Sequence, residues 1–322
     1  MKRAGPRPAA NRRSAPGPGR TAAPRFALAR RVTAELARHQ ADLKAAARRV
    51  RSKDDREAAH DLRVTTRRMA SALDVWAGLI GDRTERIHRR LRRLRRAAGP
   101  LRDAEVMRDL LLRIAASLPH YSRLAVEDLA RRIERQLLRR SAPAARAARK
   151  ALVTKIARDL ERSLAPRAHA HVRPIGAVAA RADAIARVAQ LERTARSTLA
   201  SAIRDGKDDA LHAARIAVKR WRYGVESLRA LDRDSRAAAA RRAPALVETR
   251  ALQRALGTLH DLAEVSETIA KRIRTLDQRE RRAEAEALQE ALPWIARQRE
   301  APLAEIQGLV TTRRVVSRRR AG

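Results

Sequence analysis

The sequence predicts an all-α protein made of two related helical bundles, and three observations lead to this prediction. Apolar residues recur three and four positions apart, as on one face of a helix, whereas the apolar–polar alternation of strands is absent. Only 2% of the residues are aromatic although 44% are hydrophobic, so Ala, Leu, Val and Ile must fill the core, which favours closely packed helices. A basic helical motif and a glycine-containing motif after it each occur twice.

The first predicted helix begins near Phe26. Its apolar residues follow the helical spacing, with polar residues between them, at Leu28, Val32, Leu36 and Leu43. This pattern predicts a long amphipathic helix with one buried face.

The next helices are predicted from their end signals. Either of the acidic residues 54–55 is a candidate N-cap for the second helix. A third helix from about Arg83 is expected to end at Gly99 and Pro100, because glycine is favoured just past a helix end and proline cannot continue a helix. A fourth helix is expected from about Asp103.

Composition divides the chain into segments. Residues 1–24 hold six basic residues, no acid and repeated Pro and Gly, so a disordered basic tail is expected. Residues 311–322, with five basic residues and no acid, are expected to be a second basic tail. The helical bundles are predicted over 25–165 and 177–310, and the Pro-containing residues 165–176 are expected to join them.

The two predicted bundles repeat each other in sequence. The motif HDLRVTTRRMASALDVW at 60–76 returns as HAARIAVKRWRYGVESL at 212–228, an offset of 152. The motif GPLRDAEV from Gly99 returns as GTLHDLAEV from Gly257, an offset of 158. A period this long is typical of a domain duplication, so we expect two antiparallel bundles that face each other about a pseudo-twofold axis.

Both copies of the first motif place a row of cations on one helix face. His60, Arg63 and Arg67 are three and four positions apart and therefore share a face. Aligned cations repel each other, so a row that occurs twice indicates a negative partner. The second row is His212, Arg215, Lys219 and Arg222. The apolar stripes lie elsewhere, at Leu62, Thr66, Met69 and Leu73 and at Leu211, Val218, Val225 and Leu228.

The net charge of +38 also favours an anionic partner. Without the eleven basic residues of the two tails, the rest of the chain still carries +27. Two explanations without an anionic partner stay open. A GC-rich genome would enrich arginine, and the cations could form scattered ion pairs with acidic residues on a solvated face. The acids that could form such pairs are Asp61, Asp74, Asp103, Glu226 and Asp261.

The residues that several kinds of catalytic, metal-binding and membrane-spanning structure require are missing from this sequence. There is no cysteine, which excludes disulfides, thiolate nucleophiles and cysteine metal sites. The HAH motif at 169–171 lacks a third ligand, so no metal or other cofactor is expected. Glycine-rich phosphate loops, a Ser–His–Asp set and paired catalytic carboxylates are not visible, which predicts a non-enzymatic protein. No apolar run approaches the ~20 residues of a membrane-spanning helix.

The doubled motifs resemble those of the CHAD domain, the conserved-histidine α-helical domain, over roughly residues 25–310. The resemblance implies two pseudo-symmetric helical bundles that flank a basic central groove and bind inorganic polyphosphate there. It also implies association with polyphosphate granules. We expect a cytoplasmic protein that associates with such granules or with the nucleoid. The binding residues that it implies are His60, Arg63, Arg67, Arg68, Arg96, Arg102, His212, Arg215, Lys219, Arg220, Arg222, Tyr223 and Arg254, with His260 as a further candidate.

The chain departs from the family in places. Many relatives carry a triphosphate tunnel domain with alternating glutamates on a strand, and this chain lacks that motif, so triphosphatase activity is not implied. The two halves also differ from each other: Ala70 and Ser71 stand opposite Arg222 and Tyr223, Arg102 stands opposite His260, and Arg95 stands opposite Gln253.

A non-specific nucleic-acid-binding protein is the alternative function. Such affinity comes mainly from phosphate contacts, which the basic charge would supply. The shortage of aromatic residues argues against sequence-specific recognition of single strands. The sequence makes no prediction of the oligomeric state.

Overall fold

The structure is a computed structural model that describes residues 23–49, 56–80, 84–140, 177–229, 231 and 236–319, with some residues of 151–162. The regular structure of these residues is helical, without strands, which confirms the predicted all-α class. Its helices are α1 (Ala23–Arg49), α2 (Arg56–Val75), α3 (Ala77–Ile80), α4 (Thr84–Ala115), α5 (His120–Arg140), α7 (Ala177–Asp205), α8 (Asp208–Ser227), α9 (Arg236–Asp277), α10 (Arg282–Gln289), α11 (Ala291–Gln298) and α12 (Glu300–Arg319).

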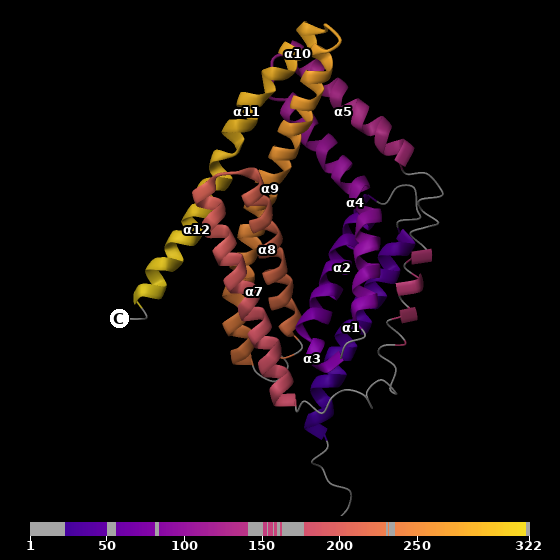
Figure 1. The fold of residues 1–322 in the computed structure, drawn as a ribbon, viewed down its shortest axis with the longest axis vertical. Coiled ribbons are helices and arrows are strands. Elements are labelled where there is room, and N and C mark those ends of the chain that lie inside the picture. Colours follow the sequence, from indigo (N-terminus) through magenta and orange to yellow (C-terminus); the bar gives the residue numbers. More distant parts are fainter. Residues whose placement is uncertain are drawn as a thin grey trace, which may run out of the picture.

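Helices α2 and α8 connect the two halves of the molecule. Helix α2 packs against α1 and α4, helix α8 packs against α7 and α9, and α2 and α8 also pack against each other. Figure 1 shows the first-half helices α1, α2 and α4 beside the second-half helices α7, α8 and α9, with α5 and α10 at the top of the view. The two basic motifs, on α2 and α8, therefore lie at the junction. The twofold relation and the domain boundaries stay predictions.

The predicted apolar stripes form the centre of the core. The stripe of α2 is buried throughout, as is that of α8, and the cations lie on other faces of both helices. Trp76 and Trp221 are each 1% exposed and belong to the same core. This main core contains residues of α1, α2, α4, α7, α8 and α9. The hydrophobic spacing therefore predicted correctly which faces of α2 and α8 are buried.

A second core lies at the other end of α4. Leu111 and Ile114 of α4 pack there with Val126 of α5 and with Val265 and Ile269 of α9. Helices α10 and α11 complete this core. Both cores contain residues from the two halves of the chain, so each half is stabilised by the other.

The predicted helix end at Gly99 and Pro100 is wrong, because α4 runs from Thr84 to Ala115 without a break. Helix α9 likewise continues past Pro244 and Gly257. Proline in a helix interior costs about 3 kcal/mol. The N-terminal part of α4 is buried in the main core and the C-terminal part in the second core, and this packing at both ends outweighs the local cost.

Other predicted boundaries fall partly outside the described residues. The candidate N-cap residues 54–55 and the joining residues 165–176 lie outside them, as does the HAH motif at 169–171. Most of the predicted N-terminal tail also lies outside, while its last two residues begin α1. Helix α12 continues to Arg319 and includes most of the predicted C-terminal tail.

The turn between α7 and α8 sets the position of the second basic helix. Gly206 has a φ of +62°, in the left-handed region that glycine adopts without a Cβ penalty. Its N–H donates to the carbonyl of Ala202 over 3.0 Å and ends α7. Asp208 and Asp209 follow in the first turn of α8, where the helix dipole favours negative charge.

Candidate anion-binding site

The cations of α2 and α8 meet at the junction between the two halves. The charges of Arg63 and Arg67 on α2 are close enough to Arg215 and Lys219 on α8 to lower the pKa of both. Arg95 of α4 joins them, because Arg67, Arg220 and Arg63 act on its pKa. The central cationic cluster is defined here as Arg63, Arg67, Arg95, Arg215, Lys219 and Arg220.

Lys219 is the most perturbed cation of this cluster. Burial, followed by the charges of Arg215, Arg67 and Arg63, lowers its pKa to about 7. The carboxylate of Asp261 opposes this shift without cancelling it. The ammonium group of Lys219 is therefore held where it lacks sufficient negative charge.

Arg215 lacks an acceptor for one of its donors. Its Nε atom is buried, and it has no hydrogen-bond partner within the part of the chain that the structure describes. Burial lowers the pKa of Arg215, and the charges of Arg67 and Arg63 lower it further, while Asp261 opposes them. A buried N–H without an acceptor costs about 1–3 kcal/mol, so an anion at this position would be stabilising.

Two carboxylates offset part of the charge of the cluster. Arg63 Nη1 lies 2.5 Å from Asp103 Oδ1, and that Asp103 side chain is 68% exposed. Asp261 is more enclosed, and its burial raises its pKa although Arg215 and Lys219 act in the opposite direction. Ion pairs within the protein were the alternative raised by the sequence. Such a pair explains the position of Arg63, but the positive charges of Arg215 and Lys219 are not fully balanced by the carboxylates near them.

Two histidines lie beside the cluster. The Nδ1 atoms of His212 and His260 are 3.2 Å apart, so one carries the hydrogen that the other accepts. Burial, followed by the charges of Arg215, His212 and Lys219, lowers the pKa of His260 to about 4. His260 is therefore uncharged near neutral pH and can serve a phosphate only as a neutral hydrogen-bonding group.

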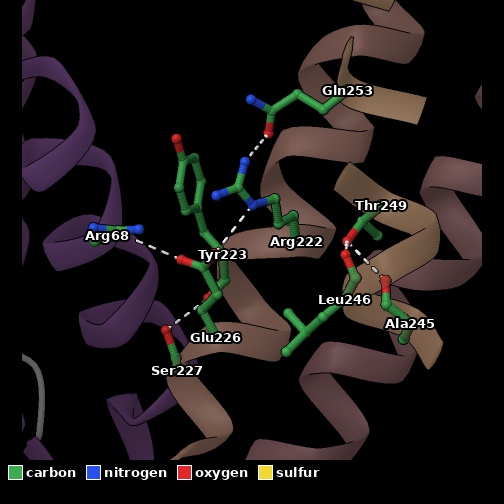
Figure 2. A network of polar contacts seen from close by, with 9 residues as sticks. All are labelled: Arg68, Arg222, Tyr223, Glu226, Ser227, Ala245, Leu246, Thr249 and Gln253. Carbon is green, nitrogen blue, oxygen red and sulfur yellow. Dashed lines mark hydrogen bonds and ion pairs between the residues drawn. The ribbon is translucent and has the colours of Figure 1, made fainter. Parts of the chain in front are cut away.

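Glu226 holds two of the arginines that the sequence assigned to the ligand. Figure 2 shows Arg68 of α2 and Arg222 of α8 on either side of this carboxylate. Arg68 Nε donates to Oε2 over 3.1 Å and Arg222 Nε donates to Oε1 over 3.0 Å. Arg222 also donates to Gln253 Oε1 over 2.8 Å. Glu226 is only 9% exposed, whereas the side chain of Arg68 is 41% exposed, so the network is a link between the halves whose carboxylate is buried and whose α2 arginine reaches the surface.

Replacement of Glu226 by alanine is expected to destabilise the protein by about 1–3 kcal/mol, because Arg68 and Arg222 would lose a partly buried charged acceptor. Urea unfolding would measure the change. The matched control is Glu85→Ala, since Glu85 pairs with Arg89 on an exposed face of α4, and it should change stability by less than about 1 kcal/mol. Equal effects would contradict a stabilising link at Glu226.

A pocket of about 420 Å³ lies on another side of this network, between α1 and the end of α8. Arg68, Tyr223 and Glu226 form part of its wall. Its remaining charged residues are mixed in sign: Arg31, Arg38 and Arg229 with Glu35 and Asp42. Because both acids and cations line it, this pocket favours a polyanion less than the central cationic cluster does.

The structure brings together some of the predicted site residues and separates others. Arg63, Arg67, Arg215, Lys219 and Arg220 share the cluster, and His212 lies beside it with His260. Arg68 and Arg222 are held by Glu226, and Tyr223, at 5% exposure, is buried next to them. His60, Arg96 and Arg254 are exposed, and the side chain of Arg102 lies outside the described part of the chain.

Sequence reasoning missed Arg95 as a site residue. Arg95 aligns with Gln253 in the other half, so a comparison of matched cations does not reveal it. The spacing along the helix could have revealed it. Arg95 lies seven residues before the predicted site residue Arg102, and both belong to α4, the helix that follows the first basic row in the chain. Only the packing of α2 against α4 places Arg95 near Arg63 and Arg67.

Metal ligands are not gathered in the described part of the chain: within those ranges, no three His, Asp or Glu side chains are grouped so that they could hold a metal ion. Among the same residues, no helix combines the length and the apolar character needed to cross a membrane.

The fold and the cluster define an all-helical protein with an excess of positive charge at the junction of its two halves. A family model described as the CHAD domain matches residues 34–270, so the chain belongs to the CHAD-domain family. The crystal structure of the CHAD domain from the plant Ricinus communis is similar in fold, with a TM-score of 0.64 and 22% sequence identity. The match covers 88% of this chain and 91% of that chain. None of the curated proteins compared with the chain matches it.

Proposed function

We propose that this protein binds inorganic polyphosphate through the central cationic cluster, without catalysing a reaction. The observation that carries the proposal is the position of Arg215 and Lys219, which are partly buried and face Arg63 and Arg67 of the other half. Burial lowers the pKa of both groups, and the neighbouring positive charges, which Asp261 offsets only in part, lower it further. A chain of phosphates would supply that negative charge and an acceptor for Arg215 Nε.

The chemistry of the side chains suits a linear phosphate chain. A guanidinium group donates two parallel hydrogen bonds to one phosphate, and a lysine adds a mobile point charge. Successive phosphates carry repeated charges, which match cations contributed by α2, α4 and α8. An unsubstituted chain is also narrow enough to approach partly buried cations, whereas a DNA duplex presents its phosphates on a wide, rigid helix.

The remaining predicted residues have outer roles in this proposal. His212 and His260 would bind as hydrogen-bonding groups beside Arg215, and Arg220 would extend the cluster. His60, Arg96 and Arg254 are exposed and would guide an approaching chain by charge or hydrogen bonding. Arg68, Arg222 and Tyr223 would act at the edge of the site, where Glu226 competes for both arginines.

Attachment to polyphosphate granules is part of the same proposal, since a granule presents many equivalent chains to one site. No catalytic group is required for such binding. The net charge of +38 also suits nucleic acid, so duplex DNA is the competitor that must be tested.

The decisive experiment titrates long-chain polyphosphate into the full-length protein at near-physiological salt, with duplex DNA of equal total charge as competitor. Polyphosphate is expected to bind tightly and DNA to displace it poorly, because only the narrow chain reaches Arg215 and Lys219. Equal competition per charge would contradict the proposed site and favour a diffuse cationic surface.

A further inference from the structure

The row of cations on α8 ends at a carboxylate. Arg215, Lys219 and Arg222 lie on one face of this helix, and Glu226 continues the same face one turn further along. Glu226 is seven residues beyond Lys219, which corresponds to ~10 Å along the helix. A phosphate chain that extends from the central cationic cluster along this face would therefore meet a negative charge.

Glu226 binds one arginine from each half of the molecule, and each arginine contacts a different oxygen. Arg68 of α2 donates from Nε to Oε2 over 3.1 Å, and Arg222 of α8 donates from Nε to Oε1 over 3.0 Å. Figure 2 shows that Arg68 reaches the carboxylate from α2, whereas Arg222 and Glu226 belong to the same helix. Only the bond of Arg68 therefore crosses between the halves.

The two arginines are held unequally. The side chain of Arg68 is 41% exposed, against 17% for Arg222. Arg222 also donates from Nη1 to Gln253 Oε1 over 2.8 Å. Within the described residues, Glu226 is the one hydrogen-bond acceptor of Arg68, which uses only its Nε there. The guanidinium of Arg68 therefore keeps donors that could bind a phosphate.

This inequality allows Arg68 to leave without isolating a buried charge. Removal of one partner from a buried ion pair is normally costly, because the other charge is left uncompensated. If Arg68 turned away, Glu226 would keep its bond to Arg222, and Arg222 would keep Gln253 as well. A phosphate offers Arg68 a charged acceptor to which a guanidinium can donate two parallel hydrogen bonds.

We propose that Glu226 holds Arg68 in the ligand-free protein, and that a bound phosphate chain takes Arg68 over while Glu226 stays paired with Arg222. This inference rests on the proposed function. Glu226 then limits the affinity for the chain, because its bond to Arg68 must break before Arg68 can bind phosphate. Glu226 is a positioning residue that acts through Arg68, and only hydrogen bonds are exchanged.

A titration of long-chain polyphosphate into full-length Glu226→Gln, at constant salt, tests this exchange. Affinity should rise about three- to tenfold above wild type, because glutamine lacks the charge that holds Arg68. The rise should disappear in the Arg68→Ala background, where no arginine remains to be released. Unchanged or lower affinity of folded Glu226→Gln, or an equal rise in both backgrounds, would overturn the inference. Absence of any binding by wild type would overturn the proposed function itself.

Glu248→Gln is the matched control, because it makes the same change in net charge. Glu248 of α9 accepts hydrogen bonds from Arg196 Nη1 over 3.0 Å and from Nη2 over 3.2 Å. Its side chain is 14% exposed, so this substitution also removes a largely buried acceptor from an arginine. The affinity of Glu248→Gln should stay near that of wild type. A rise equal to that of Glu226→Gln would show that overall charge, not the release of Arg68, sets the affinity.

A crystal structure of the wild-type protein with polyphosphate tests the exchange without a substitution at Glu226. It decides the question even if Glu226→Gln does not fold. Arg68 is expected to donate to a phosphate oxygen, with Glu226 bonded to Arg222 alone. A phosphate chain on the central cationic cluster with Arg68 still bonded to Glu226 would overturn the inference. A chain bound away from the cluster would overturn the proposed site as well.

Discussion

Replacement of both Arg67 and Arg215 by alanine is expected to weaken polyphosphate binding by a factor on the order of 100 or more. Each substitution would remove charged hydrogen bonds to phosphate, which contribute about 1.5–3 kcal/mol apiece. The two residues come from different halves of the molecule, and Arg67 is close enough for its charge to act on Arg215. Titration of polyphosphate into the full-length variant at constant salt would measure the loss.

The matched control removes the same charge elsewhere. Arg187 and Arg193 are exposed on α7, where they interact with Asp183 and Gln190 of the same helix. The double alanine variant at these positions should bind polyphosphate within a few-fold of wild type. If both double variants lose affinity equally, net charge rather than the central cationic cluster determines binding.

A measurement of stability also distinguishes a role of Arg67 and Arg215 in binding from a role in supporting the fold. Burial lowers the pKa of Arg215, and the charges of Arg67 and Arg63 lower it further, so removal of Arg67 and Arg215 relieves repulsion and a cost of burial in the ligand-free protein. The double variant is therefore expected to unfold at the same urea concentration as wild type or at a higher one. A large loss of stability would instead indicate that these arginines support the fold.

Replacement of Trp76 by alanine is expected to reduce the free energy of unfolding by about 3–5 kcal/mol. Trp76 is 1% exposed in the main core, and its indole Nε1–H donates to the carbonyl oxygen of Ser227 over 3.0 Å. This bond crosses from the end of the first basic helix to the end of the second. The variant would lose both the packing and the connection between the halves, and urea unfolding would report the sum.

Trp76→Phe separates these two contributions. Phenylalanine retains most of the apolar contact but leaves the carbonyl of Ser227 without the indole donor, so a loss of about 1–3 kcal/mol is expected. A cost below about 1 kcal/mol for the alanine variant would contradict the assignment of Trp76 to a tightly packed core.

The helical class and the buried faces could be predicted because they depend on local spacing. Leu62 and Met69 on α2, and Val218 on α8, recur at the helical period, and all three are buried. The same period placed Arg63 and Arg67 on one side of their helix, away from this stripe. Such inferences need no knowledge of the partner helix, because side chains three and four residues apart share a face in any helix.

The helix ends were less predictable because tertiary packing decided them. Gly99 and Pro100 are strong local stop signals, yet α4 continues through them with both ends buried in separate cores. Burial of apolar side chains at both ends of α4 stabilises the continuous helix by more than the proline in its interior destabilises it.

The sequence by itself determined the all-α class, the buried stripes and the two rows of cations. Only the tertiary structure decided that Arg63 and Arg67 meet Arg215 and Lys219, that Arg95 joins them, and that Glu226 holds Arg68 and Arg222 instead. The reason is physical: a periodic pattern reports neighbours on one helix, whereas burial and charge at Lys219 depend on segments more than one hundred residues away in the chain.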